Sequence, residues 1–268
     1  GYFWAGDNRI LYLKDTGGDE NYQLYGVNID GSDPKAYTAI PGVRTQIIDP
    51  LEEIDSLIII GTNQRNPMIF DPYRLNLNTG EMTMLCENPG DIQGWQTDHN
   101  GRLRVAYAIV DGVNSQIRYR ETEAEPFRPV LTTNFKESVS FAAFTPDNKQ
   151  VYAVTNLGRD KVALVLMDPA TCEEIEQLYV NDKYDLDNIW YSDAQKKLLG
   201  DSYTGDPAVT EQDYYDVHLW KSGLNPSTLA VEAAPQIHVK NRSYGPSTPF
   251  EEHPDRLKDI MRAAAGNG

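Results

Sequence analysis

The chain has 268 residues, of which 40% are hydrophobic and sixteen are tyrosine, and its formal net charge is −16. This composition allows a sizeable core and favours β-structure. The acidic balance argues against nucleic acid or an anionic membrane as partner, because both are bound through clustered Lys and Arg, and no apolar run approaches the roughly 20 residues of a membrane helix.

The cysteines and histidines give no sign of a metal site. Cys86 and Cys172 lack the CxxC spacing of a zinc site, although a single bridge between them stays open. His218, His238 and His253 do not have metal-ligand spacing. We therefore expect no metal. The first residues carry no basic segment of the kind that opens a signal peptide, so the compartment is left open.

A polar turn followed by an apolar run recurs along the chain. These runs begin at Gly6, Pro50, Asp98, Pro146 and Ser192, which lie 44, 48, 48 and 46 residues apart. This spacing is in the range of a four-stranded propeller blade. The sequence therefore predicts an all-β fold, a β-propeller of four-stranded antiparallel blades.

Each repeat also holds a second alternating run, which completes a pattern of four strands. Residues 73–77 alternate with period two, as a half-buried strand does. Asp30-Gly31 and Asn78-Thr79-Gly80 suit hairpin turns, because Gly and Asn tolerate a positive φ. The blades that we predict, about five in number, span residues 1–41, 42–89, 90–135, 136–187 and 188 to about 223.

Residues 224–268 break this pattern. We predict an irregular tail with a short helix near 254–265, where Pro254 suits a first turn and Leu257, Ile260 and Met261 share one face. About five blades taken from a larger ring would leave apolar faces and strand edges exposed. Three outcomes stay open: closure as a smaller ring, capping by the tail, or self-association through open blade edges.

A glycine- and arginine-containing turn, Gly158-Arg159-Asp160, stands between the second and third strands of the fourth predicted blade. Related polar segments occur at 15–21, 62–66 and 110–114. Gly gives backbone freedom, Asp and Asn bond to nearby N–H groups, and Arg can fork onto carboxylates or carbonyls of the next blade. Arg65, Arg159 and Asp160 therefore either order these loops or contact a ligand or partner.

Trp95 has two interpretations, of which the first is favoured. It fills space between blades, or it stacks against a bound ligand. The four candidate contact residues from the sequence are thus Arg65, Trp95, Arg159 and Asp160.

Four segments, taken in order, carry a family resemblance. They are RILYLKDTGGDENYQLYGVNIDG, NQRNPMIFDPYRLNLNTGEMTMLCENPGDIQGWQTDHNGRLRVA, IRYR and FTPDNKQVYAVTNLGRDKVALVLMDPAT. From Gly1 to about Gly205 the chain resembles the propeller domain of the prolyl oligopeptidase family of serine peptidases, most of all its dipeptidyl-aminopeptidase and acylaminoacyl-peptidase branch.

The resemblance implies an enzyme in which an α/β-hydrolase domain carries the Ser, Asp and His. The propeller would cap that site and admit only short or unfolded peptides. The implied partners are a peptide substrate and a hydrolase domain or chain, and the family uses no metal or organic cofactor. The sequence departs from the family by having fewer blades, a different continuation after residue 223 and no hydrolase domain. We therefore expect a propeller piece without a catalytic triad.

Ser202 is the residue that comes nearest to a catalytic motif. Gly200-Asp201-Ser202-Tyr203-Thr204 lacks the last glycine of a nucleophile elbow, and it also resembles the GDS block of SGNH-type esterases. However, Ser202 lies where a blade strand is due, and His218 and His253 have no Asp three residues earlier. We expect an ordinary strand residue. An esterase ranks third, after the peptidase propeller and a free-standing TolB-like or WD-repeat-like binding propeller.

Overall fold

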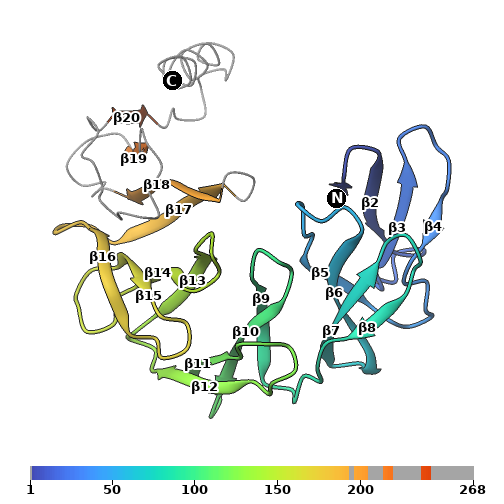
Figure 1. The fold of residues 1–268 in the computed structure, drawn as a ribbon, viewed down its shortest axis with the longest axis horizontal. Helices are drawn as coiled ribbons and strands as arrows, with labels where there is room; N and C mark the ends of the chain where they lie inside the picture. The colour runs from blue at the N-terminus through green and yellow to red at the C-terminus, as the bar shows by residue number, and fades with distance from the viewer. Residues whose placement is uncertain (1, 193–195, 205–213, 220–236, 243–268) are drawn as a thin grey trace. The chain divides into compact units, whose positions relative to one another are not determined.

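The computed structural model describes residues 2–192, 196–204, 214–219 and 237–242. Over these residues it contains twenty strands and no helix, and so no helix long and apolar enough to cross a membrane. The strands form five four-stranded sheets, each made of four strands that are consecutive in the chain (Figure 1). The prediction of an all-β fold with four-stranded blades is confirmed, and the architecture is consistent with a propeller.

Sheets 1 to 3 follow one another from the first described residue to Thr133. Sheet 1 consists of β1 (Tyr2–Ala5), β2 (Arg9–Lys14), β3 (Gln23–Asn28) and β4 (Lys35–Ala36). Sheet 2 consists of β5 (Thr45–Asp49), β6 (Leu57–Asn66), β7 (Ile69–Asn76) and β8 (Met82–Met84). Sheet 3 consists of β9 (Ile92–Thr97), β10 (Leu103–Val110), β11 (Asn114–Tyr119) and β12 (Arg128–Thr133). Neighbouring strands pair antiparallel in the order of the chain.

Sheets 4 and 5 continue the same order. Sheet 4 consists of β13 (Val139–Phe144), β14 (Val151–Thr155), β15 (Ala163–Met167) and β16 (Glu174–Val180). Sheet 5 consists of β17 (Leu186–Ser192), β18 (Lys197–Thr204), β19 (Tyr214–Leu219) and β20 (Ile237–Arg242). The chain divides into two compact units, Gly1–Ala153 with Leu166–Glu176, and Val154–Val165 with Gln177–Gly268. Sheets 1 to 3 and β13 belong to the first unit, and sheet 5 belongs to the second.

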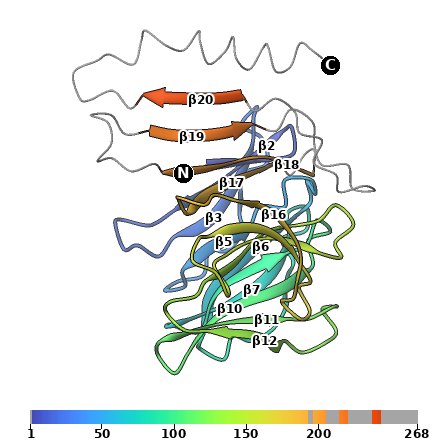
Figure 2. The same ribbon diagram turned by 90° about the vertical axis from the view of Figure 1, so that its left-hand side faces the viewer.

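Sheet 5 extends further along the chain than the sequence predicts. Its last strand, β20, pairs with β19 (Figure 2) and lies inside the stretch 224–268 that we expected to be irregular, so that expectation is wrong for 237–242. The strand was missed because 205–213 and 220–236 separate β18, β19 and β20 in the sequence, whereas the strands of the other sheets follow one another closely. The predicted helix near 254–265 lies outside the described residues.

The core of the first unit begins between sheets 1 and 2. The alternation of apolar residues along the strands puts one face of each sheet into a shared buried cluster. The buried members of this cluster are Leu11, Leu24, Tyr37, Ile58, Ile60, Leu75 and Leu77. Burying an aliphatic or aromatic side chain of this size is worth about 1.5–3 kcal/mol. The hydroxyl of Tyr37 donates a hydrogen bond of 2.8 Å to the carbonyl of Leu77, so the two sheets are also joined by a polar contact.

Candidate functional site

The hairpin between β6 and β7 is much shorter than the sequence predicts. Residues 62–66, which we expected to form a loop, belong to β6, and a register shift after Thr62 pairs Asn66 with Ile69. Only Pro67 and Met68 make the turn. These polar residues are compatible with a strand because Gln64 and Arg65 extend beyond the core and lie at the surface.

Arg65 makes a forked ion pair with a buried carboxylate. Its Nε and Nη2 donate hydrogen bonds of 2.8 Å to the two carboxylate oxygens of Asp71 on β7. The side chain of Asp71 is wholly buried, whereas that of Arg65 is 35% exposed. The hydrogen bond to Asp71 raises the pKa of Arg65, so the guanidinium stays charged. The carboxylate is therefore in the same sheet as Arg65, not in the next blade.

The same ion pair fixes the connection that leads into sheet 3. Nη2 of Arg65 also donates to the carbonyl of Asn88 at 2.8 Å, and the backbone N–H of Asn88 donates to Asp71 at 2.7 Å. The buried side chain of Asn88 accepts a hydrogen bond from the N–H of Gly90 and donates to the carbonyls of Phe70 and Ile92. Arg65 thus orders the structure between two sheets, and it does so next to an open cavity.

Trp95, on β9, lines that cavity. Its ring packs against Phe127 with centroids 5.6 Å apart and an interplanar angle of 52°, and it covers the small buried cluster of sheet 3. The cavity lies between sheets 2 and 3 and has a volume of about 180 Å³. We call it the polar cavity; it is lined by Gln46, Met68, Ile69, Phe70, Asn88, Gly90, Ile92, Gln93 and Trp95. Of the four candidates from the sequence, Trp95 lines this cavity, whereas Arg65 does not line it but bonds to the carbonyl of Asn88, which does.

Arg159 and Asp160 belong to the second unit. Nη1 of Arg159 donates to Oε1 of Gln177 on β16 at 3.1 Å, which ties the turn to its own sheet. The carboxylate of Asp160 is 88% exposed and pairs with Lys161 at 3.1 Å. Gly158 has a φ of +67°, a conformation that favours glycine. The glycine in this turn is therefore explained by the backbone, and the arginine by a contact within the sheet.

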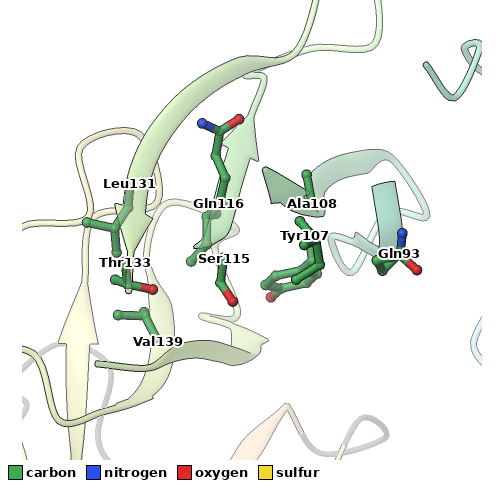
Figure 3. A pocket seen from close by; sticks show the side chains of 10 residues that line it. Gln93, Tyr107, Ala108, Ser115, Gln116, Leu131, Thr133 and Val139 are labelled. Atoms are coloured by element: carbon green, nitrogen blue, oxygen red, sulfur yellow. The ribbon is translucent and has the colours of Figure 1, made fainter. Parts of the chain in front are cut away.

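A second cavity, of about 140 Å³, lies on the face of sheet 3 that is turned toward β13. We call it the apolar cavity; it is lined by Gln93, Tyr107, Ala108, Ile109, Ser115, Gln116, Ile117, Leu131, Thr133 and Val139. Figure 3 shows the labelled side chains of β9, β10, β11 and β12 side by side, with Val139 of β13 next to Thr133. Gln93 lines both cavities, which makes them neighbours.

Sequence reasoning missed Gln46 and Gln93, because an amide in a strand belongs to no catalytic or ligand motif. One feature of the sequence could have pointed to these two glutamines. Each residue is the second of the first strand in its blade, in Thr45-Gln46-Ile47 and in Ile92-Gln93-Gly94. An alignment of the repeats would have shown a glutamine recurring at this position in two neighbouring blades.

Neither a metal centre nor a disulfide is found in the described part of the chain. No group of three or more His, Cys, Asp or Glu in it could hold a metal ion. Cys86 and Cys172 are both free, so the bridge left open by the sequence does not form. Ser202 lies in β18, paired with Asn188 of β17 and Val217 of β19, at the strand position that the sequence predicts.

Comparisons with known proteins agree with this fold. No family model matches the sequence. The chain is 30% identical over 178 residues to dipeptidyl aminopeptidase BIII of Pseudoxanthomonas mexicana, an alignment that covers 63% of this chain and 25% of the relative. The chain spans roughly a quarter of the length of the curated relatives it matches.

Two solved structures share the fold. One is prolyl oligopeptidase B from Galerina marginata bound to a 25mer macrocyclization substrate, with a TM-score of 0.53, 12% identity, and coverage of 82% of this chain and 34% of that one. The other is TolB from Acinetobacter baumannii, with a TM-score of 0.50, 16% identity, and coverage of 81% and 51%.

Proposed function

We propose that this chain is the substrate-gating propeller of a prolyl oligopeptidase-family serine peptidase, a proposal supported by its similarity to dipeptidyl aminopeptidases of that family. Peptide bonds would be cleaved by a hydrolase domain or chain that works with it. The observation that carries the proposal is the 30% identity to a dipeptidyl aminopeptidase, which extends over 178 residues of a chain built from four-stranded sheets.

A gate that selects by size needs sheets that do not move apart, and the boundary between sheets 2 and 3 supports this role. Arg74 on β7 donates to both carboxylate oxygens of Glu123 at 2.8 and 3.1 Å, and to the carbonyl of Gly101 at 2.8 Å. Glu123 also accepts the backbone N–H of Leu103 at 2.9 Å. A forked pair of this kind fixes orientation as well as distance.

A third arginine holds the turn after β13 to sheet 3. The side chain of Arg104 is 4% exposed and pairs with Glu121 at 2.8 Å. It lies 5.1 Å from the ring centroids of both Tyr119 and Phe144, and its Nη1 donates to the carbonyl of Asn148 at 2.7 Å. Arginine is suited to this position because its flat, permanently charged group can stack and fork at once.

The test compares long and short substrates. The chain, together with its hydrolase domain or partner, would be assayed on a dipeptidyl p-nitroanilide and on a 40-residue peptide with the same first two residues. Loosening the boundary with Arg74→Met is expected to raise kcat/KM for the long peptide at least fivefold and leave the short one within twofold. Lys149→Met, which breaks an ion pair of two exposed side chains, is the matched control.

If Arg74→Met changed kcat/KM by the same factor for the long and the short substrate, the gating proposal would be refuted. The proposal also requires that this chain alone hydrolyses neither substrate. Turnover by the purified chain that disappears in Ser202→Ala would overturn it and favour the esterase.

A free-standing binding propeller is the second candidate, and the likeness to TolB favours it. It predicts a stable monomer that captures a protein partner and shows no association with a hydrolase. Size-exclusion chromatography with light scattering at several concentrations, together with purification from native extracts, would separate the two functions.

A further inference from the structure

Two neighbouring cavities of different chemistry open on the first unit. The polar cavity is bordered by amide groups and backbone, whereas the apolar cavity is bordered by Tyr107, Ile117, Leu131 and Val139 (Figure 3). Cavities near 150 Å³ with apolar walls can hold a molecule as large as benzene, so about 140 Å³ is enough for one aliphatic side chain.

The polar cavity offers hydrogen-bonding groups that the described part of the protein leaves unused. The amide of Gln46 makes no hydrogen bond to a described residue, and that of Gln93 makes only a long one, 3.4 Å, to the carbonyl of Asp91. Nη1 of Arg65, whose Nη2 donates to the carbonyl of the cavity-lining Asn88, also has no acceptor among the described residues. The two glutamine amides line the same cavity as the strongly exposed side chain of Met68.

The pairing of the two cavities selects the class of ligand. An amide side chain donates and accepts at once, which matches the alternating C=O and N–H groups of an extended peptide backbone. A peptide also carries apolar side chains that could enter the second cavity, whereas an oligosaccharide has none. The net charge of −16 disfavours a polyanion.

We propose that these two cavities form one binding site for an extended peptide. The backbone would bond to Gln46, Gln93 and Nη1 of Arg65, and an aliphatic side chain would enter the apolar cavity. This inference rests on the proposed function and deepens it, since it says where the propeller holds the peptide that it admits.

The experiment measures binding of a fluorescein-labelled hexapeptide, Ala-Ala-Leu-Ala-Ala-Ala, by anisotropy, together with an analogue in which Ser replaces Leu. Ser115→Phe fills the apolar cavity, and Gln93→Ala removes the shared amide from an exposed position. Lys149→Met serves as control, and circular dichroism checks that each variant is folded. We expect Ser115→Phe and Gln93→Ala each to weaken binding of the Leu peptide about tenfold, and Lys149→Met to leave it unchanged.

A double-mutant cycle, which combines the Leu-to-Ser change in the peptide with Ser115→Phe in the protein, tests whether the leucine side chain enters the apolar cavity. The change from Leu to Ser should weaken binding about tenfold in the parent protein and less than twofold in Ser115→Phe. Equal binding of both peptides, no binding at 1 mM, or competition by maltohexaose at the same concentration would each overturn the site. If size selection in the peptidase assay persists while the site fails, the proposed function stands; if size selection is absent as well, both fall.

Discussion

The ion pair between Arg74 and Glu123 allows a quantitative prediction about the boundary between sheets 2 and 3. Both side chains are about three-quarters buried, with 26% and 25% exposed, and the pair is forked. Exposed pairs are worth about 0.2–1 kcal/mol, and hydrogen bonds to charged groups about 1.5–3 kcal/mol. Because the Arg74–Glu123 pair is more buried than an exposed pair but is not fully buried, we expect a coupling energy of about 1.5–2 kcal/mol.

A double-mutant cycle of Arg74→Met and Glu123→Gln measures this coupling energy. Equilibrium unfolding in urea at pH 7, followed by tryptophan fluorescence, gives the free energy of unfolding for each variant, and the cycle removes the effect of each single change. The exposed pair Lys149–Asp147, at 3.7 Å, is the matched control, with an expected coupling below about 0.5 kcal/mol. A coupling for Arg74–Glu123 no larger than that of the control would refute the reasoning.

The remaining predictions concern pH, a thiol, a buried carboxylate and a turn. Burial acts to raise the pKa of Glu123, but hydrogen bonds from Arg74 and from a backbone N–H outweigh it, so the folded pKa is lowered. The stabilisation by the Arg74–Glu123 pair is therefore fully present above the unfolded pKa of about 4.3 and is lost as pH falls through the folded pKa. The same urea assay, repeated at several pH values, measures this loss. Burial raises the pKa of the Cys86 thiol to about 11, so its labelling by a disulfide reagent at pH 8 should be at least 100-fold slower than in urea, and equal rates would contradict this. Arg65→Met leaves the buried Asp71 charge without its partner and should lower the free energy of unfolding measured in urea, with partial recovery on adding Asp71→Asn; no recovery would contradict this. Gly6→Ala should lower it by about 1–2 kcal/mol, because φ is +61° there.

The sequence was sufficient for the fold because each blade repeats the same local pattern. The predicted turns at Asp30-Gly31 and at Asn78–Gly80 occur in the structure, with φ of +83° at Gly31 and +76° at Gly80. β20 escaped detection because its repeat is interrupted by extra chain, which destroys the spacing on which the prediction depends.

The candidate site was less accessible to sequence reasoning. The side chain of Arg65 suited a forked contact, but the identity of its partner depends on how far β6 continues before the chain turns, and that register shift leaves no mark in the sequence. The cavities are harder still to predict from the sequence, because they form where strands of separate blades meet. Gln46 and Gln93 lie 47 positions apart in the chain and border one space only after both sheets have formed.

Each of sheets 1 to 3 comes from one uninterrupted stretch of chain, 2–36, 45–84 and 92–133. All strand partners within such a sheet are therefore available as soon as that stretch has left the ribosome, and pairing does not wait for distant residues. The apolar cluster shared by sheets 1 and 2 does need both, so the first sheet gains its full stability only when the second has been synthesised. Within sheets 1 to 3, strand pairing can therefore follow the order of synthesis.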